Sequence, residues 1–475
     1  MLIDTHCHLD DPAYAADLDA VLARAAEAGV GGMLTIGTDL ASSRRAVALA
    51  AARPTVWAAV GIHPQDATQW TDEADAALEQ LAAQPKVVAI GEVGLDYYRE
   101  TSPRAQQQHA FRRALQLAHR RRLPVIIHCR DAWDDLFAIL REVRSPPIVP
   151  QGLPPVAGVL HCFTGDAAAA KTALDLGLTI SFAGNLTFKN AEPLRAVARQ
   201  IPTDRLVVET DAPYLTPHPR RGRRNEPAEV VQTATVLAQL KSLPLDDVAR
   251  ITSVNAYQLF GVGPAPARGV IAYAIRDSLY LNITNACTDR CVFCALSDPE
   301  FWAGTGTAPF VKGHHLRMPR DPSSAELLEA AGDPARYREV VFCGYGEPTI
   351  RLPVLVEVAR ALKQKGARRI RLDTNGHGNL IHKRSIVPDL AGLVDEVSVS
   401  LNTATAEQYV EICRPTFGLP TYEAIKTFIT ECKGVIPTVI ASVVAMPGVD
   451  VEAIRRIAED ELGVTYRVRT YDEVG

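Results

Sequence analysis

The sequence predicts an α/β protein of two successive domains, an eight-stranded parallel barrel followed by a six-stranded partial barrel. Strand-like apolar runs alternate with helical stretches through the whole chain. Its 475 residues also exceed the about 250–300 residues that one hydrophobic core usually serves. A run of small residues, "LFGVGPAPARGVIAY" (259–273), separates two such series. We therefore expect a first domain at residues 1–263, a linker at 264–272 and a second domain at 273–475.

Each predicted strand is an apolar run between helical stretches. In the first domain these runs are residues 1–6, 30–36, 55–63, 86–92, 123–128, 156–161, 178–184 and 205–211. Eight runs alternating with alanine-rich helical stretches indicate a parallel (β/α)8 barrel. In the second domain the runs are residues 279–284, 339–344, 369–374, 396–402, 435–445 and 464–471. Six runs, with helical stretches between most of them, indicate an incomplete barrel of the (β/α)6 kind.

The composition is that of an ordinary globular protein, with 47% hydrophobic and 22% charged residues, which excludes disordered and fibrous classes. The net charge of −5 argues against broad adhesion to nucleic acid but allows a local basic groove. The sequence contains neither a long apolar run nor a signal-peptide pattern, so we expect a cytoplasmic protein without a membrane anchor. Its nine cysteines then indicate metal binding, catalysis or burial rather than disulfides. The oligomeric state is not predicted.

Metal-binding side chains occur at the ends of several predicted strands in the first domain. His6 and His8 lie two residues apart, so both imidazoles point to the same side of their strand. One such pair could equally be two polar residues at a strand exit. Four further apolar runs end on Glu92, His128, His161 and Asp211. Because all these ends meet at one mouth of a parallel barrel, we expect a metal centre there.

Four imidazoles and two carboxylates exceed the needs of one tetrahedral ion, so we expect two divalent ions, Zn, Mg or Mn. In this hypothesis His6, His8 and Asp211 hold one ion, His128 and His161 hold the other, and Glu92 bridges them. Two ions about 3.5–4 Å apart polarise a phosphoryl oxygen and lower the pKa of a bound water. We expect Asp211 also to accept the proton of that water.

Several motifs of this domain, taken together, resemble the TatD family of metal-dependent hydrolases. They are "DTHCHLD", "GIHP", "GEVGLDYY", "PVIIHCRDAW", "HCFTG" and "ETDAPYLTP", spread over residues 1–262. The resemblance implies a TIM barrel, a divalent-metal hydrolase and the six ligands above, with deoxyribonuclease activity in several members. It also places His63 of "GIHP" near the site as a catalytic or substrate contact. DNA or another phosphodiester is the expected substrate; an amide or ester is the alternative, since the same scaffold attacks carbonyls.

A basic stretch, "HPRRGRRNEP" (218–227), follows the eighth run. Loops after the seventh and eighth strands of such barrels frequently bind phosphate. A solvated surface loop is the other interpretation. We expect a substrate phosphate contact from at least one of four residues, Arg220, Arg221, Arg223 and Arg224.

The second domain contains three closely spaced cysteines in "NACTDRCVFCAL" (285–296), namely Cys287, Cys291 and Cys294. Three thiolates ligate three irons of a cubane cluster and leave the fourth iron open. Zinc is the competing ligand, but it needs a further cysteine or histidine nearby. The candidates His314 and His315 are distant in the sequence.

The CxxxCxxC spacing, with aromatic Phe293 before the last cysteine, resembles the radical S-adenosylmethionine (radical SAM) superfamily. The resemblance implies a 4Fe–4S cluster whose open iron binds S-adenosylmethionine and cleaves it reductively to a radical. An electron donor such as flavodoxin or ferredoxin is then required. The second domain further resembles small radical enzymes described as TatD-associated, here fused to the hydrolase. The sequence does not indicate what this domain modifies, and a redox-sensing or cofactor-binding module without turnover is the alternative.

The segment "VVFCGYGEPT" is similar to the glycine-rich segment of that superfamily, through Gly346 and Glu347, although Tyr345 stands where many relatives carry glycine. At the ends of the next strands, Asp373, Ser400 and Asn402 are expected to contact the cofactor. Strand-end capping is an equally good explanation for these three. The remaining cysteines are expected to be buried thiols: Cys7, Cys129, Cys162, Cys343, Cys413 and Cys432.

Overall fold

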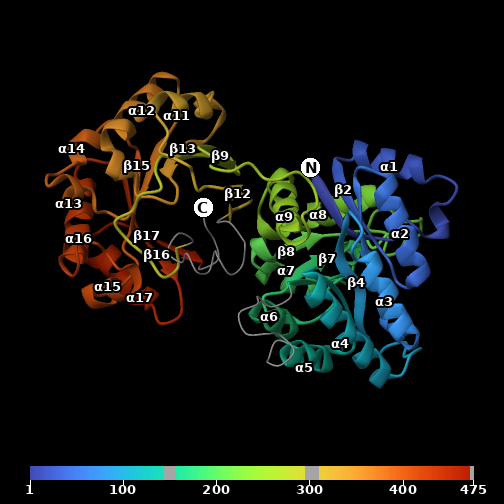
Figure 1. Ribbon diagram of the computed structural model, residues 1–475. Helices are drawn as coiled ribbons and strands as arrows, with labels where there is room; N and C mark the ends of the chain where they lie inside the picture. The colour runs from blue at the N-terminus through green and yellow to red at the C-terminus, as the bar shows by residue number, and fades with distance from the viewer. Residues whose placement is uncertain (144–156, 295–309, 471–475) are drawn as a thin grey trace. The chain divides into compact units, whose positions relative to one another are not determined.

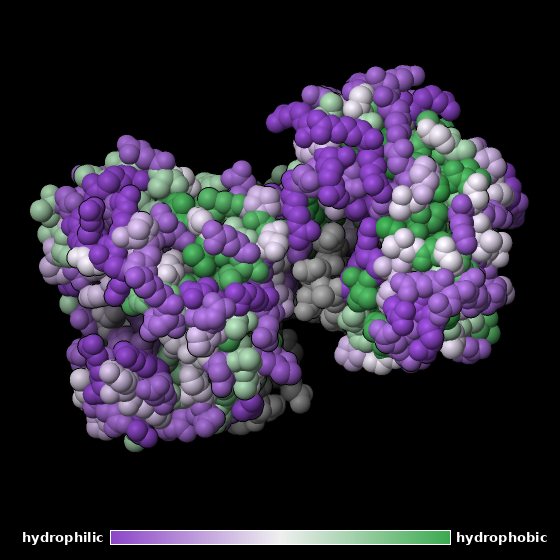
Figure 2. Space-filling view, turned by 180° about the vertical axis from the view of Figure 1, so that it is seen from behind, coloured by the Kyte–Doolittle hydropathy of each residue, from purple (hydrophilic) through white to green (hydrophobic). Residues whose placement is uncertain are grey.

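The computed structural model describes residues 1–143, 157–294 and 310–470 (Figure 1). The chain divides into two compact units, Met1–Pro266 and Ala267–Gly475. Among the described helices, none is long and apolar enough to cross a membrane. On the face shown in Figure 2, the surface of each unit is mostly hydrophilic with scattered hydrophobic patches.

The first unit is built on eight parallel strands that are hydrogen-bonded in sequence order, from β1 to β8. They are β1 Leu2–Cys7, β2 Val30–Ile36, β3 Val56–Val60, β4 Val87–Asp96, β5 Val125–Arg130, β6 Gly158–Leu160, β7 Thr179–Phe182 and β8 Leu206–Val208. A parallel bridge between Cys7 and Ala212 joins the first strand to the chain after the last, so the barrel is nearly closed. The predicted eight-stranded barrel is confirmed, and each predicted run overlaps one strand.

Helices follow the strands and surround them in Figure 1. They are α1 Leu18–Glu27, α2 Leu40–Ala52, α3 Asp72–Leu81, α4 Arg104–Arg121, α5 Trp133–Val143, α6 Ala167–Asp175, α7 Glu192–Gln200, α8 Val230–Lys241 and α9 Leu245–Phe260. Several begin at side-chain caps; Asp39, Thr71 and Asp166 each accept a hydrogen bond from a backbone N–H of the first helical turn. Buried side chains such as Phe111 and Leu136 pack this helical layer onto the strands.

The strand ends differ most from the sequence prediction at β4, β5 and β8, and β5 continues two residues past His128 to Arg130. β4 continues past Glu92 to Asp96, so Glu92 lies inside the strand rather than at its end. The continuation "VGLD" is fully buried and pairs with β5, which explains why the strand does not stop. β8 ends at Val208, so Asp211 lies three residues beyond the strand.

The second unit contains a seven-stranded sheet in the order β17-β16-β15-β14-β13-β10-β9. The strands are β9 Ala272–Ile275, β10 Ser278–Asn282, β13 Glu339–Cys343, β14 Ile370–Thr374, β15 Glu396–Ser400, β16 Thr438–Ala445 and β17 Thr465–Thr470. Six of them are parallel, which confirms the partial barrel, and β9 pairs antiparallel with β10.

The helices of this unit pack against one face of the sheet through a core that includes Phe342, Leu372 and Phe428. They are α11 Ser324–Ala331, α12 Leu352–Gln364, α13 Gly378–His382, α14 Val387–Leu390, α15 Ala406–Cys413, α16 Pro420–Lys433 and α17 Val451–Arg456. A smaller cluster, with Tyr280 and Val341, covers the other face.

The sequence did not predict β9 or the hairpin β11 Phe310–Val311 and β12 His314–His315. Ala272, the last residue of the predicted linker, is the first residue of β9. Strands of two to four residues carry too little periodicity to be recognised in a sequence.

Candidate functional site

The six predicted metal ligands of the first unit come together at one end of its barrel. They are His6 in β1, His8 directly after it, Glu92 in β4, His128 in β5, His161 directly after β6, and Asp211 after β8. Each of the four imidazoles has a ring nitrogen within 4.0 Å of a carboxylate oxygen of Glu92.

Glu92 lies at the centre of this cluster, and its two oxygens face different imidazoles. Oε1 lies 2.8 Å from His128 Nδ1 and 2.8 Å from His161 Nε2. Oε2 lies 3.4 Å from His6 Nε2 and 4.0 Å from His8 Nε2. The carboxylate therefore connects two groups of nitrogens, one on each oxygen.

Asp211 and His63 complete these two groups. Asp211 Oδ1 lies 3.4 Å from His8 Nε2 and 3.6 Å from His6 Nε2. His63 Nε2 lies 3.4 Å from Glu92 Oε1, and its Nδ1 accepts a hydrogen bond from the Gln65 backbone. The ligand atoms of His63, Glu92 and His128 lie within 4.8 Å of one another, so His63 is as close to the cluster as the predicted ligands.

His161 lies between the two groups. Its ring stacks on that of His6 with 4.0 Å between centroids, while its Nε2 faces Glu92. His6, His161 and Asp211 also form a group whose ligand atoms lie within 4.8 Å of one another. The structure thus places His161 near both groups, whereas the sequence assigned it to one.

Two carboxylates behind the cluster were missed by the sequence prediction. Asp96, the last residue of β4, has Oδ2 3.3 Å from His128 Nε2 and accepts a hydrogen bond from Gln65 Nε2. Burial opposes ionisation of this buried carboxyl, but its hydrogen bonds and the charge of His128 hold its pKa below its usual value. A carboxylate on the far nitrogen of an imidazole fixes its tautomer and orientation.

Glu209 is the second of these carboxylates, and it faces the far ring nitrogen of His161. Its Oε1 lies 3.4 Å from His161 Nδ1 and accepts a hydrogen bond from the Cys162 backbone, while its Oε2 accepts one from Ser181. The sequence signal for Glu209 is its place at the start of the motif "ETDAPYLTP", two residues before Asp211.

The charges and hydrogen bonds within the cluster of predicted ligands shift the pKa values of its members. Burial opposes ionisation of Glu92, but the charges of His161 and His63 hold its pKa well below the usual value. Burial would lower the pKa of His8, yet its hydrogen bond to Asp211 raises that pKa to about 9. Burial lowers the pKa of His6, whose two ring nitrogens are buried and have no hydrogen-bond partner in the described residues. Buried nitrogens without partners, facing carboxylates, make a donor set that fits divalent cations.

The four arginines predicted to contact phosphate are mostly engaged by the protein itself. Arg220 pairs with Glu229, and Arg224 pairs with Asp17. Arg221 lies over the ring of Phe188 and donates to a backbone carbonyl. A phosphate contact by these residues or by Arg223 stays a prediction.

In the second unit, the three predicted cluster cysteines follow β10 at the carboxyl end of the sheet, and the motif's last two residues lie outside the described part. The glycine-rich segment packs directly on the chain that leads into Cys287. The Gly346 backbone N–H donates to Thr284 O, and that of Glu347 to Ala286 O. A Cβ atom on Gly346 would lie 2.3 Å from Thr284 O, so only glycine fits this contact.

Glu347 joins the ends of two neighbouring strands. Its buried carboxylate accepts hydrogen bonds from the Thr349 backbone and the Thr374 hydroxyl on Oε1, and from the Asn375 backbone on Oε2. Burial raises the pKa of Glu347, and these hydrogen bonds oppose the shift. Both oxygens are thus engaged by the chain itself.

A buried polar network lies behind the cysteines and was not predicted. Asn375 Nδ2 lies 3.9 Å from Cys287 Sγ and donates to Asp289 Oδ2. The Tyr409 hydroxyl donates to the same oxygen and lies 3.1 Å from His377 Nε2. The network anchors residues between the first two cysteines to the end of β14 and to α15.

The three other predicted cofactor contacts lie at the ends of two neighbouring strands, with Asp373 in β14, Ser400 the last residue of β15, and Asn402 two residues after it. Asp373 pairs with Arg371, Ser400 accepts a hydrogen bond from Arg469, and Asn402 donates to Cys413 Sγ. Of the six cysteines expected to be buried, four are buried and two are partly exposed: Cys7, Cys129, Cys413 and Cys432 are buried, and Cys162 and Cys343 are intermediate. Cys413 also forms a hydrogen bond with Cys291, which raises the pKa of Cys291 well above its usual value.

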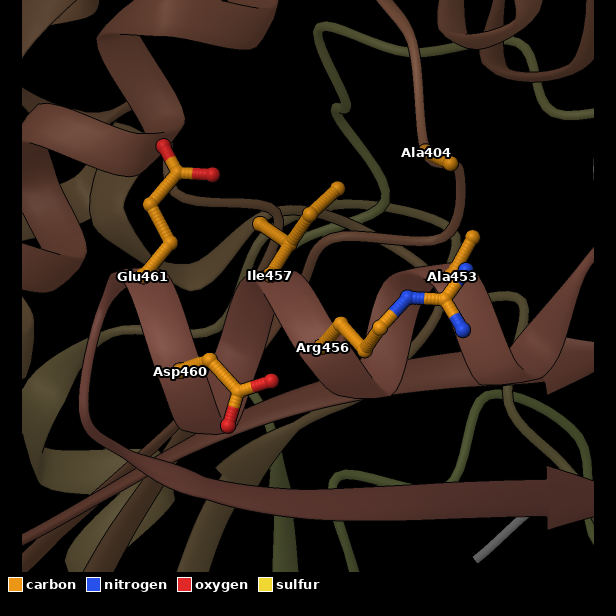
Figure 3. Close-up of a pocket in the computed structure, with 6 residues that line it drawn as sticks. All are labelled: Ala404, Ala453, Arg456, Ile457, Asp460 and Glu461. Atoms are coloured by element: carbon orange, nitrogen blue, oxygen red, sulfur yellow. The ribbon is translucent and has the colours of Figure 1, made fainter.

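A separate hollow of about 460 Å³ lies beside α17 (Figure 3). It is lined by Ala404, Ala453, Arg456, Ile457, Asp460 and Glu461, and five of these come from one continuous helical stretch. No predicted site residue lines it.

The profile of the family described as TatD related DNase matches residues 3–261, and that of the radical SAM superfamily matches residues 281–460. An uncharacterized metal-dependent hydrolase, YabD of Bacillus subtilis (strain 168), is 42% identical over 262 residues, which are 55% of this chain and 100% of that protein. The 3'-5' ssDNA/RNA exonuclease TatD of Erwinia amylovora is 39% identical over 267 residues, 55% of this chain and 100% of that protein.

Among solved structures, the TatD homolog YJJV from Escherichia coli K12 matches with a TM-score of 0.51 and 34% sequence identity. The match covers 55% of this chain and 98% of that chain.

Proposed function

We propose a bifunctional enzyme, on the premise that the chain belongs to the TatD related DNase family through residues 3–261 and carries a radical SAM superfamily domain at residues 281–460. The first unit is a TatD-type metal-dependent hydrolase, and we propose that it cleaves phosphodiester bonds of nucleic acid. The second unit is a radical SAM domain whose substrate is not assigned. Thiolate ligands need a reducing compartment, which favours the cytoplasm.

The observation that carries the hydrolase proposal is the position of Glu92, with one oxygen toward each group of imidazoles. We propose that Glu92 bridges two divalent ions. His6, His8 and Asp211 would hold one, and His128 and His161, with His63 beside them, would hold the other. When bound, such ions polarise a phosphoryl oxygen and lower the pKa of water.

The protein residues have separate roles in this proposal. The Asp211 side chain is 16% exposed against 5% for Glu92, so Asp211 is the carboxylate that water reaches and the one that accepts the proton of the attacking water. Asp96 and Glu209 are positioning residues that hold the imidazoles of His128 and His161.

A phosphodiester is favoured over an amide or ester because relatives such as the Erwinia amylovora protein are named exonucleases of single-stranded DNA and RNA. The test is hydrolysis of a labelled single-stranded DNA by the full chain loaded with zinc, magnesium or manganese. Metal-dependent release of nucleotides, lost in Glu92→Gln, supports the proposal. Cleavage of amide or ester substrates without cleavage of DNA would replace it with the alternative.

For the second unit we propose a 4Fe–4S cluster held by Cys287, Cys291 and Cys294, with S-adenosylmethionine on the open iron. The supporting observation is the anchoring of the cysteine loop by Gly346 and by the Asp289–Asn375 network. When bound, the reduced cluster would cleave S-adenosylmethionine reductively, with electrons from a donor such as flavodoxin or ferredoxin. We propose that Glu347 acts by joining the strand ends, while Asp373, Ser400 and Asn402 remain candidate cofactor contacts.

The test is anaerobic reconstitution with iron and sulfide, followed by measurement of 5′-deoxyadenosine under strong reductant. Formation of 5′-deoxyadenosine supports a radical enzyme. An intact cluster that never yields it favours a redox-sensing or cofactor-binding module.

A further inference from the structure

Two exposed tyrosines distinguish the mouth of the first unit. Among its described residues, the exposed large apolar side chains are Met1, Tyr98 and Tyr214. Tyr98 is 61% exposed and Tyr214 is 55% exposed. Single exposed aromatic residues are ordinary on a protein surface. These two need an explanation because both adjoin the cluster of predicted metal ligands.

Tyr214 lies against the His8 side of the cluster. Its backbone N–H donates to Asp211 O, three residues earlier in the chain. Its ring centroid lies 6.0 Å from that of His8, and its hydroxyl donates to Asp11 Oδ2 over 3.2 Å. The ring is thus held beside a predicted ligand with more than half of the residue open to solvent.

Tyr98 adjoins the His128 side. Asp96 accepts a hydrogen bond from the Tyr98 backbone on Oδ1 and lies 3.3 Å from His128 through Oδ2. Arg130 follows His128 by two residues on β5, so both side chains leave the same side of the strand. The Arg130 guanidinium lies 3.7 Å from the Tyr98 ring centroid and places a positive charge there.

The strand order puts these tyrosines on opposite sides of the cluster. Tyr214 belongs to the region where β8 meets β1, and Tyr98 to the region of β4 and β5, which lies half a turn around an eight-stranded ring. A phosphodiester at the cluster would therefore have one exposed ring on each side along its chain.

We propose that Tyr98 and Tyr214 are base-stacking platforms for the nucleotides on the two sides of the cleaved phosphate, with Arg130 contacting the neighbouring backbone. This inference rests on the proposed phosphodiesterase function and defines its substrate as single-stranded polynucleotide of at least two nucleotides. Every base has a flat face, so stacking tolerates any sequence. A paired base in a duplex must first be unstacked to offer that face.

The experiment uses the metal-loaded full chain and two substrates, a mixed-sequence single-stranded DNA 12-mer and the small ester ethyl methyl phosphate, which has neither a base nor any aromatic ring and whose hydrolysis is followed by phosphorus NMR. The variants are Tyr98→Ala and Tyr214→Ala, with Tyr→Phe and Tyr→Leu at each position as controls for the ring and for apolar bulk. We expect each alanine variant to lose about 5- to 150-fold in kcat/KM on the 12-mer, mainly through KM, as alanine substitution at stacking aromatics does. Leucine should lose as much, phenylalanine should retain activity, and the small ester should be unaffected.

Equal loss on both substrates would show that the tyrosines support the metal centre, which overturns the inference. Full activity of the alanine variants on the 12-mer also overturns it. If the wild type cleaves the small ester but not the 12-mer, the inference fails while a phosphodiesterase stands. If it cleaves neither, the proposed function fails. Fluorescence anisotropy of the labelled 12-mer then still tests the stacking role, because the wild type must bind the 12-mer more tightly than the alanine and leucine variants do.

Discussion

The predicted metal ligands of the first unit and the cysteines of the second are held in different ways. In the first unit, six side chains lie in or just after strands of a nearly closed barrel, and their nitrogens and oxygens already lie 2.8–4.0 Å apart. In the second, three cysteines lie in a loop after β10, and Cys287 is exposed. The barrel strands fix the first set directly, whereas the loop is held by residues packed behind it.

This contrast indicates where each site is vulnerable. Side chains on rigid strands keep their geometry when one neighbour changes, so substitutions in the first unit should affect chemistry more than structure. Ligands on a loop depend on the anchors beneath it. Substitution of an anchor in the second unit should therefore lower cluster content even when every cysteine is intact.

Loss of the central carboxylate should have the largest effect. Glu92→Gln keeps the size of the side chain but removes the charge that faces both imidazole groups. We expect kcat/KM for single-stranded DNA to fall at least about a thousandfold, ~4 kcal/mol of transition-state stabilisation. Iron content and 5′-deoxyadenosine formation should be unchanged in the same protein. Hydrolysis at the wild-type rate would exclude the bridging role.

Removal of one cluster ligand is the matching change in the second unit. Cys291→Ala should abolish the iron–sulfur absorption and 5′-deoxyadenosine formation while hydrolysis persists, since three thiolates are the smallest set for the cluster. Cys413→Ala is the matched control, because Cys413 contacts Cys291 and is not a predicted ligand. The Cys291→Ala variant could retain its irons while a variant with both Cys291→Ala and Cys413→Ala loses them. That result would show that Cys413 replaces Cys291 as a ligand.

An intermediate effect is expected at the position of Asp96. Asp96→Asn removes the charge that orients His128 but keeps the hydrogen-bonding shape. Loss of such an outer partner typically costs 10–100-fold in metal affinity or activity, so we expect about that decrease in metal affinity. Titration with a competing chelator measures it directly. An unchanged affinity would show that the barrel holds His128 without this carboxylate.

The smallest effect should come from an anchor of the cysteine loop. Gly346→Ala forces a Cβ atom to within 2.3 Å of Thr284 O, and overpacking of this kind costs about 1–3 kcal/mol. We expect a lower melting temperature and reduced iron content after reconstitution. Gly434→Ala is the control in the same unit, because its Cβ atom would meet nothing closer than 3.7 Å. Equal behaviour of the two variants would argue against the anchoring role.

The strands and the ligands at their ends could be predicted because both are properties of short segments. An apolar run followed by His161 or Asp211 carries its own signal, whatever the rest of the chain does. Glu92 was placed at a strand end for the same reason, and this was wrong, because the pairing of β4 with β5 extends the strand.

The supporting residues could not be predicted because their roles depend on contacts between distant segments. Asn375 reaches Cys287 across 88 residues, and Asp96 meets His128 across the β4–β5 pair. Asp96 lies in the motif "GEVGLDYY", but the motif does not indicate which imidazole its carboxylate meets. Tyr98 and Tyr214 likewise acquire their meaning only when the strand order places both beside the cluster.

We propose that two independent sites, one of divalent ions and one of iron, coexist in this chain. Elemental analysis of the anaerobically reconstituted full chain tests it most directly, with Cys287, Cys291 and Cys294 all replaced by alanine in a second sample. We predict about two divalent ions and about four irons per wild-type chain. The variant should keep its divalent ions and its hydrolysis of DNA while losing the irons. Loss of the divalent ions together with the irons, in a variant that is still folded, would show that the two sites depend on each other.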